Sequence, residues 1–204
     1  MHPLDQIKAE LKTGAESLTY KHNTLNYTIL DFWRWSVSDI LSNATRGRLA
    51  EFLVATATNI DITVVRDEWS AYDLVTPDGI KLEIKSAAYL QSWSQKNLSK
   101  ISFSTKLARG WDFETDKRST IAKRHADVYV FCLLKHEDKV TVDPLNLDHW
   151  EFYIMTTGEL NNYTRSQHSI TLKSLYSLTK AVSYGEINDA IKVKHRTNNS
   201  DASI

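Results

Sequence analysis

The segment at residues 127–134, with the sequence DVYVFCLL, constrains the fold more than any other part of this 204-residue chain. Apolar residues run through it without alternation, which is typical of a central strand that is covered on both faces. The chain must therefore place helices or further strands on both sides of a sheet. With 42% apolar and 25% charged residues, it has the composition of a globular protein and not of a largely disordered one.

The hydrophobic period divides the rest of the chain into shorter elements. Apolar residues at three- and four-residue steps predict helices at 4–18, 27–41, a third running to about 59, and short ones at 174–178 and 186–193. Strand-like runs are found at 62–65, 71–76, 80–87, 100–105 and 152–156. Asn43 or Thr45 is the expected N-cap of the third helix. We expect the aromatic residues of the second helix to hold it against the rest of the fold.

The chain reads as one unit, because it has no internal repeat and no linker rich in Pro, Gly or Ser. We expect an α/β sandwich with a central mixed sheet. Residues 1–44 would form a helical extension packed on the core, residues 45–193 the core itself, and residues 194–204 a frayed tail.

The stretch from Tyr72 to Lys85 predicts a hairpin whose turn decides which side chains meet. Pro77, Asp78 and Gly79 suit successive positions of a three-residue loop, a type I turn closed by a glycine in the left-handed conformation. In that register Thr76 faces Ile80, and Asp73 lies opposite Glu83. A two-residue turn would instead pair Asp73 with Leu82 and send the two carboxylates to opposite faces.

In the second strand of this hairpin, Glu83 and Lys85 point to the same face. With Asp73 beside them, two carboxylates and an amine would converge. Neighbouring carboxylates repel unless a cation lies between them, and hard oxygen ligands suit Mg²⁺ or Mn²⁺. A lysine next to such an ion can hold or deprotonate an attacking water, while the ion stabilises the charge that builds on a phosphate. The arrangement favours metal-assisted phosphodiester hydrolysis.

On these residues the sequence resembles the PD-(D/E)xK nuclease superfamily over about residues 46–134. The resemblance implies a restriction-endonuclease-like α/β/α sandwich with extra N-terminal helices. It implies Asp73 and Glu83 as metal ligands, Lys85 as the residue that orients water, and Glu51 as a further carboxylate near the metal. Most members are Mg²⁺-dependent DNA nucleases, and many are dimers, so a homodimer is one expectation. Tyr72 stands where the name-giving proline would be.

The E-x-K triplet alone carries little information, since it also occurs at Glu10 and at Glu137. The first of these lies in a helical pattern and the second in a polar loop, so neither has the strand context of the motif. The alternative for Glu83 and Lys85 is an ordinary solvated sheet face. Glu51 is the only charge between residues 49 and 59, and its alternative is a surface residue on that helix.

The residues after the E-x-K strand are the predicted nucleic-acid contacts. Positive and negative residues each number 25, so any attraction to nucleic acid must come from local segregation of charge. Residues 96–124 contain eight basic and three acidic residues, with Trp93, Phe103, Trp111 and Phe113 interleaved. We expect contacts from Lys106 and Arg109, and from Arg46 and Arg48 one turn before Glu51. Gln91 is included because some superfamily members carry a downstream glutamine. The alternative is a solvated charged loop.

The leading hypothesis is a Mg²⁺-dependent nuclease that hydrolyses DNA with a metal-activated water. The alternatives are a catalytically inactive nuclease-like module that binds nucleic acid or a protein partner, and an interaction protein that uses its aromatic N-terminal helices. The single Cys132 excludes a disulfide framework. The chain also lacks a signal-peptide pattern and any run of roughly 18 apolar residues. We therefore expect a cytoplasmic protein without a membrane partner.

Overall fold

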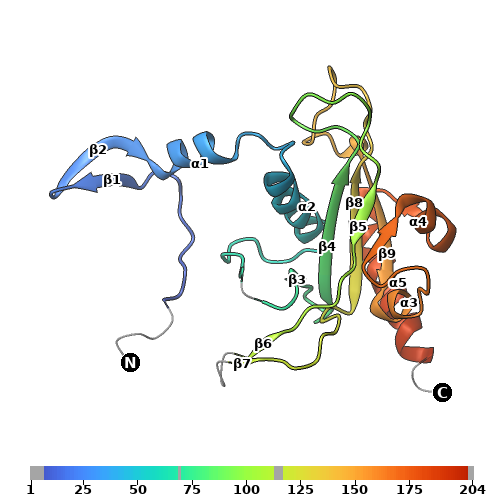
Figure 1. The fold of residues 1–204 in the computed structure, drawn as a ribbon. Helices are drawn as coiled ribbons and strands as arrows, with labels where there is room; N and C mark the ends of the chain where they lie inside the picture. Colours follow the sequence, from blue (N-terminus) through green and yellow to red (C-terminus); the bar gives the residue numbers. More distant parts are fainter. Residues whose placement is uncertain (1–6, 69, 113–116, 202–204) are drawn as a thin grey trace.

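The computed structural model describes residues 7–68, 70–112 and 117–201. In these residues the centre of the molecule is a five-stranded mixed sheet in the order β11-β9-β8-β4-β3 (Figure 1). β4 and β8 are parallel, and the other neighbours in this sheet are antiparallel. The strands are β3 (Leu74–Val75), β4 (Lys81–Ala88), β8 (Val128–Leu134), β9 (Trp150–Thr156) and β11 (Ala181–Val182). The expected mixed α/β fold with a central mixed sheet is therefore confirmed.

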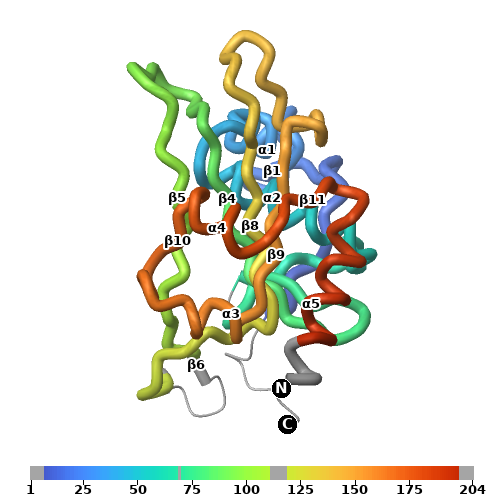
Figure 2. Tube along the Cα trace, turned by 90° about the vertical axis from the view of Figure 1, so that its right-hand side faces the viewer, coloured from blue at the N-terminus to red at the C-terminus, as the bar shows by residue number. Residues whose placement is uncertain are grey.

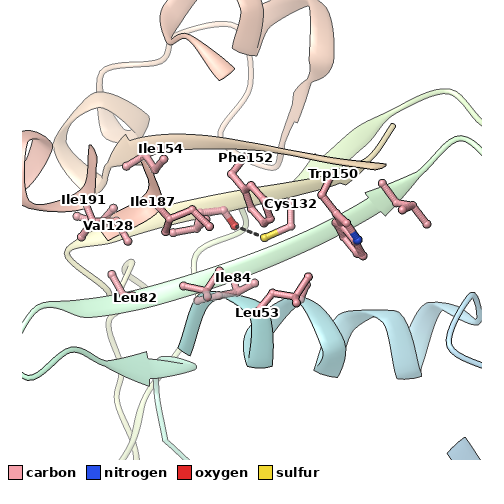
Figure 3. Close-up of a cluster of buried hydrophobic side chains, with 14 of the residues drawn as sticks. Leu53, Leu82, Ile84, Val128, Cys132, Trp150, Phe152, Ile154, Ile187 and Ile191 are labelled. Atoms are coloured by element: carbon pink, nitrogen blue, oxygen red, sulfur yellow. Dashed lines mark hydrogen bonds between the residues drawn. The ribbon is translucent and has the colours of Figure 1, made fainter. Parts of the chain in front are cut away.

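Strand β8 is the centre of the core, as its sequence predicts, because every one of its residues is buried. On one face, Val128 and Cys132 pack with residues of β4, β9, α2 (Asn43–Ala57) and α5 (Ile187–Asp201) (Figure 3). On the other face, Phe131 packs with residues of β5 (Ser102–Ser104), β10 (Ser169–Thr171) and α4 (Leu172–Leu178). Figure 2 shows β5 and β10 on one side of the sheet and α5 on the other. Burial on both faces is the reason that the strand carries no alternation.

The hairpin of β3 and β4 has the predicted register. Leu74 pairs with Leu82, and Val75 pairs with Lys81. The Thr76 N–H donates to the Ile80 carbonyl at 3.0 Å, and Gly79 has a φ of 81°. A side chain would be strained at that φ, so a glycine closes the three-residue loop.

The N-terminal region differs from the prediction. The helix expected at 4–18 is absent from the described part of that range. A hairpin of β1 (Ser17–Tyr20) and β2 (Asn23–Thr28) begins within it and continues beyond it. Lys21 and His22 form its two-residue turn with φ values of 48° and 66°. The apolar spacing in the sequence has no partner face to bury, since Leu11 is 59% exposed. Residues 4–6 of the predicted helix lie outside the described residues.

Helix α1 (Ile29–Val37) begins two residues later than predicted, at a capping box formed by Thr28 and Asp31. No residue of this fully described helix is buried, and Trp35 is 84% exposed. The expectation that its aromatic residues hold it against the fold is wrong. Figure 1 shows the hairpin and α1 extending away from the sheet. We call residues 7–37 the N-terminal arm.

Other boundaries also shift. Residues 62–65 contain a turn at Ile62 and Thr63 instead of a strand, because the Asp61 carboxylate accepts hydrogen bonds from the Thr63 N–H and hydroxyl at 2.8 and 2.6 Å. Helix α2 follows Ser42, whose side chain makes no capping hydrogen bond, so neither predicted cap is correct. Helix α5 continues to Asp201, past Lys194, where the chain was expected to fray. The proposed domain boundaries themselves stay predictions.

The remaining elements are short. They are β6 (Trp111–Asp112), β7 (Lys117–Arg118), α3 (Thr157–Asn161), and 3-10 turns at Leu147–His149 and Tyr184–Glu186. Of the charged segment at 96–124, Phe113, Glu114 and Asp116 lie outside the described residues. Among the helices that the structure describes, none has the length and apolarity that crossing a bilayer requires.

Candidate active site

Asp73 lies just before β3, where the regular pairing with β4 has ended. Its backbone N–H donates to the Leu82 carbonyl at 3.0 Å, and its carboxylate Oδ2 accepts a hydrogen bond from the Ile84 N–H at 2.7 Å. The side chain thus satisfies a backbone donor of β4 that β3 no longer reaches. Continuous pairing would put Asp73 directly opposite Glu83. Instead, the carboxylate lies beside Ile84, the residue between Glu83 and Lys85.

Glu83 and Lys85 form an ion pair along β4. The Lys85 Nζ donates to the Glu83 Oε1 at 2.5 Å, and the two side chains are 20% and 30% exposed. Tyr129 and Phe131 of β8 are their partners in the parallel register. Both residues of β8 are buried, so the ion pair borders the core on one side and solvent on the other. The alternating orientation predicted from the sequence brings these two side chains together.

Glu51 projects from α2 and is bound by Arg66 from the loop that follows this helix. The Arg66 Nε donates to the Glu51 Oε2, and its Nη2 donates to Oε1 at 3.2 Å. This two-point contact leaves the Glu51 side chain 14% exposed. Sequence reasoning did not identify Arg66, because it belongs to no motif and lies in a loop that was predicted in part as a strand.

The charges of these residues interact. Burial raises the pKa of Glu83, and the Asp73 and Glu51 carboxylates raise it further, while Lys85 opposes the shift. Burial also raises the pKa of Glu51, against the hydrogen bond from Arg66, with contributions from Asp73 and Lys85 of opposite sign. Three carboxylates from α2, the hairpin and β4 therefore lie within electrostatic reach of one another and of one amine.

A cavity of about 620 Å³ opens beside this group, and we call it the hairpin cavity. Glu51 and Asp73 line it, together with Arg48, Arg66 and the apolar side chains Phe52, Ile62, Val64 and Leu74. Glu83 and Lys85 do not line it. Asp73 is therefore the carboxylate that connects the cavity with the ion pair on β4.

The donor set suits a hard cation, because it consists of carboxylate oxygens. Glu51 is occupied by Arg66, and Glu83 by Lys85. In the part of the chain that the structure describes, no three His, Cys, Asp or Glu side chains are gathered around a position for a metal ion. The metal-ligand roles predicted for Asp73, Glu83 and Glu51 stay predictions.

The predicted nucleic-acid contacts fall into two groups. Arg46 and Gln91 are 3% and 7% exposed, so their prediction as DNA contacts is not supported. The Arg46 guanidinium donates to the Leu41 carbonyl at 2.6 Å, to Asn43 Oδ1 at 2.6 Å and to Gln91 Oε1 at 3.4 Å. It therefore fastens the start of α2 onto the sheet instead of facing solvent.

Three other predicted contacts are exposed: Arg48, Lys106 and Arg109. Arg48 lines the hairpin cavity and forms an ion pair with Glu68 at 3.3 Å, with side chains more than half exposed. Such an exposed pair is weak and can exchange for a phosphate. A role of these three residues in binding nucleic acid stays a prediction.

Comparison with known families identifies the group to which the chain is related. The family model of bacteriophage T4 endonuclease IV matches residues 2–174, which is well over half of the chain. The chain belongs to the bacteriophage T4 endonuclease IV family. A search of curated proteins gave no match. The match to the endonuclease IV family includes Glu51, Asp73, Glu83 and Lys85, and it ends within α4, so α5 lies beyond it. This chain is therefore a member of a nuclease family.

Proposed function

We propose that this protein is a Mg²⁺-dependent endonuclease that hydrolyses DNA, and that Asp73, Glu83 and Lys85 form its catalytic centre. The observation that carries the proposal is the 2.7 Å hydrogen bond from the Ile84 N–H to the Asp73 carboxylate. It holds the Asp73 carboxylate at Ile84, the residue between Glu83 and Lys85. Membership of the endonuclease IV family supports a nuclease, and carboxylates beside an amine suit phosphodiester hydrolysis.

We further propose that the chain is a PD-(D/E)xK enzyme with a restriction-endonuclease-like fold. The order of elements supports this assignment: a helix with Glu51, an antiparallel hairpin with Asp73, the E-x-K strand β4, and a parallel central strand β8. The hairpin register is the feature on which the assignment depends, because it decides which side chains share the edge of β4.

Each residue has a separate role in this proposal. Asp73 and Glu83 would hold a Mg²⁺ or Mn²⁺ ion, which when bound supplies a Lewis acid for the charge that develops on the phosphate. Lys85 would hold the attacking water at its Nζ and stabilise negative charge near it. Because burial raises the pKa of Glu83, the proton affinity of this group competes with cation binding. Glu51 would be a further carboxylate that becomes available when Arg66 releases it.

The decisive experiment compares matched variants in a cleavage assay. Supercoiled, linear and single-stranded DNA, and RNA of the same sequence, are incubated with the purified protein in Mg²⁺, Mn²⁺ or EDTA. Asp73→Asn, Glu83→Gln and Lys85→Ala should each lose cleavage while binding DNA. Asp78→Asn is the matched control, because Asp78 lies in the turn of the same hairpin and pairs with Lys192. Wild-type activity in Asp73→Asn would refute the proposed centre. DNA binding without cleavage by wild type would instead favour the inactive nuclease-like module.

A further inference from the structure

A second cavity, of about 430 Å³, lies where β4 and β8 begin, and we call it the basic cavity. Its charged side chains are Lys81, Lys123, Arg124 and Asp127, three cations against one carboxylate, and His125 and His195 also line it. Lys81 and Lys123 are exposed. The single carboxylate is already engaged, since the Asp127 Oδ2 accepts the Lys81 N–H at 2.9 Å. The cavity is therefore positively charged in a chain of zero net charge.

Arg124 provides a buried cation at this cavity. It is 7% exposed, and its guanidinium donates to Asn161 Oδ1 at 2.6 Å, to Gln167 Oε1 at 3.0 Å and to the Thr105 carbonyl at 2.8 Å. All of these acceptors are neutral. No carboxylate of the described residues lies within 4.0 Å of the guanidinium, and its buried Nε has no hydrogen-bond partner among them.

The absence of a counterion among the described residues has a physical consequence. A buried charge is costly unless it is paired, so most buried guanidinium groups have a carboxylate partner. Neutral oxygens orient Arg124 but leave its positive charge in place. The basic cavity thus combines a buried, hydrogen-bonded cation with two exposed lysines, which suits a phosphate group.

The basic cavity is adjacent to the candidate active site. Tyr72 lines both cavities and directly precedes Asp73. The Lys81 Nζ lies 5.4 Å from the centre of the Tyr72 ring. Tyr129, the partner of Glu83 in the parallel register, is influenced by charges from both regions. Burial raises the pKa of Tyr129 to about 12, the Glu83 carboxylate raises it further, and the Arg124 guanidinium lowers it. The guanidinium and the carboxylates therefore act on the same phenol.

We propose that the basic cavity binds a backbone phosphate of the substrate strand next to the phosphate that is cleaved, with Tyr72 between the two positions. The inference depends on the proposed function for its substrate. It assigns phosphate contact to Lys81 and Lys123, with the buried Arg124 adding positive charge to the cavity. The sequence did not indicate this role for Lys81, which belongs to the hairpin. Base identity is not read by these groups, so the contact positions the strand without specifying its sequence.

The test measures DNA binding without cleavage, in the Asp73→Asn background with EDTA. Fluorescence anisotropy gives the Kd of labelled single strands and duplexes over a range of salt concentrations. Lys81→Ala with Lys123→Ala should raise the Kd about tenfold at low salt, and the slope of log K against log salt should fall by about 1 to 2. The matched control is Lys173→Ala with Lys180→Ala, two exposed lysines at and after α4 that do not line the cavity. Thermal melts establish that both double variants are folded.

Chemically altered strands distinguish the sources of the phosphate. A neutral methylphosphonate at one internal position should weaken binding to the parent and leave binding to the Lys81→Ala, Lys123→Ala variant unchanged. Strands with a 5′-hydroxyl and a 5′-phosphate should behave alike. A response restricted to the 5′-phosphate, or competition by inorganic phosphate alone, would assign the cavity to a free phosphate group and overturn the proposal.

The two proposals fail in different ways. If wild type cleaves DNA but the Lys81→Ala, Lys123→Ala variant has the Kd and salt slope of the control variant, the phosphate site is refuted and the nuclease proposal stands. If no Asp73-dependent cleavage is found but the variant still loses affinity and salt dependence, the nuclease proposal fails. The cavity is then a nucleic-acid contact of a binding protein.

Discussion

Two E-x-K triplets in this chain have the same end residues and entirely different surroundings. Glu83 and Lys85 lie on β4, form a half-buried ion pair and have the Asp73 carboxylate beside them. Glu137 and Lys139 lie in a loop after β8, where Lys139 donates to the Trp93 carbonyl at 2.5 Å and the intervening Asp138 binds Val140 and Thr141. In the loop, these polar groups bond two backbone groups and one hydroxyl, and no neighbouring strand of the described residues brings a second carboxylate beside them. On the strand, the pleat and the neighbouring hairpin bring three charged groups together, so the sheet supplies the chemistry that the triplet alone lacks.

The largest expected effect is on catalysis. Glu83→Gln should reduce cleavage about 10²–10⁴-fold, because it removes one of the two carboxylates that would share the cation. Glu137→Gln should cleave at the wild-type rate. Single-turnover rates with saturating Mg²⁺ measure both. Equal rates in the two variants would mean that the strand context confers no activity.

The second prediction concerns the packing beneath the β4 triplet. Phe131 pairs with Lys85 across the parallel register, is fully buried and lies 5.2 Å from the Phe103 ring, centre to centre. Phe131→Ala should lower the free energy of unfolding by about 3–5 kcal/mol. Beside the loop triplet, Val140 is 92% exposed, and Val140→Ala should change it by less than about 0.5 kcal/mol. Urea unfolding monitored by circular dichroism gives both values. Comparable losses would mean that the loop is as well packed as β8.

The third prediction uses the raised pKa of Glu83. Because the pKa of Glu83 is higher in the folded protein than its ordinary value of 4.5, the protonated group stabilises the fold at pH values below 4.5. This stabilisation is lost as the pH rises through the pKa of Glu83 in the folded protein. Without metal, Glu83→Gln should therefore gain stability relative to wild type as the pH rises through this window. Glu137→Gln is the matched control. A pH-independent difference between Glu83→Gln and wild type would contradict the electrostatic description of the site.

Added Mg²⁺ should instead stabilise wild type more than Glu83→Gln. At a free Mg²⁺ concentration 100-fold above its Kd, binding stabilises a protein by about 2.7 kcal/mol, which is about 5–10 °C in Tm for a chain of this size. Wild type and Glu137→Gln should show this shift, larger at pH 8 than at pH 5, and Glu83→Gln should lose most of it. Differential scanning fluorimetry measures the shift. An undiminished shift in Glu83→Gln would place the cation elsewhere.

The smallest expected effect tests the turn that sets the register. Gly79 has a φ of 81°, and Gly79→Ala should cost about 1 kcal/mol. Gly185 has open space around it and no such φ, so Gly185→Ala should be neutral or slightly stabilising. Cleavage by Gly79→Ala should fall only if the register of Asp73 shifts. Thermal melts and cleavage rates together distinguish a loss of stability from a change of register.

The sequence predicted the parts of the fold that local chemistry and burial decide together. Strand β8 was found because burial on both faces removes alternation, and the hairpin register was found because Pro77, Asp78 and Gly79 allow few turns. Helix α1 of the N-terminal arm was predicted apart from its ends, but the helix predicted at residues 4–18 was wrong, because its apolar spacing has no surface to pack against. For that region the sequence pattern alone did not distinguish a helix from a hairpin.

The sequence predicted the motif residues of the candidate site, but it did not predict the side chains that bind them. The neighbourhood of Glu83 and Lys85 follows from strand alternation. The contact between Glu51 and Arg66 depends on the path of the loop after α2, which no local pattern encodes. The burial of Arg46 and Gln91 was not predicted for a related reason. Whether a polar side chain faces solvent or fastens two elements depends on how α2 lies on β4, and this is a tertiary property.

The burial of Cys132 has a practical consequence. Its side chain is fully covered at the centre of β8, and burial raises the pKa of its thiol, so the reactive thiolate is suppressed in the folded protein. It is also the only cysteine of the chain. A new cysteine introduced on the N-terminal arm or at the rim of either cavity would therefore accept a maleimide dye or spin label selectively. The native protein can serve as its own unlabelled background for distance measurements on bound DNA.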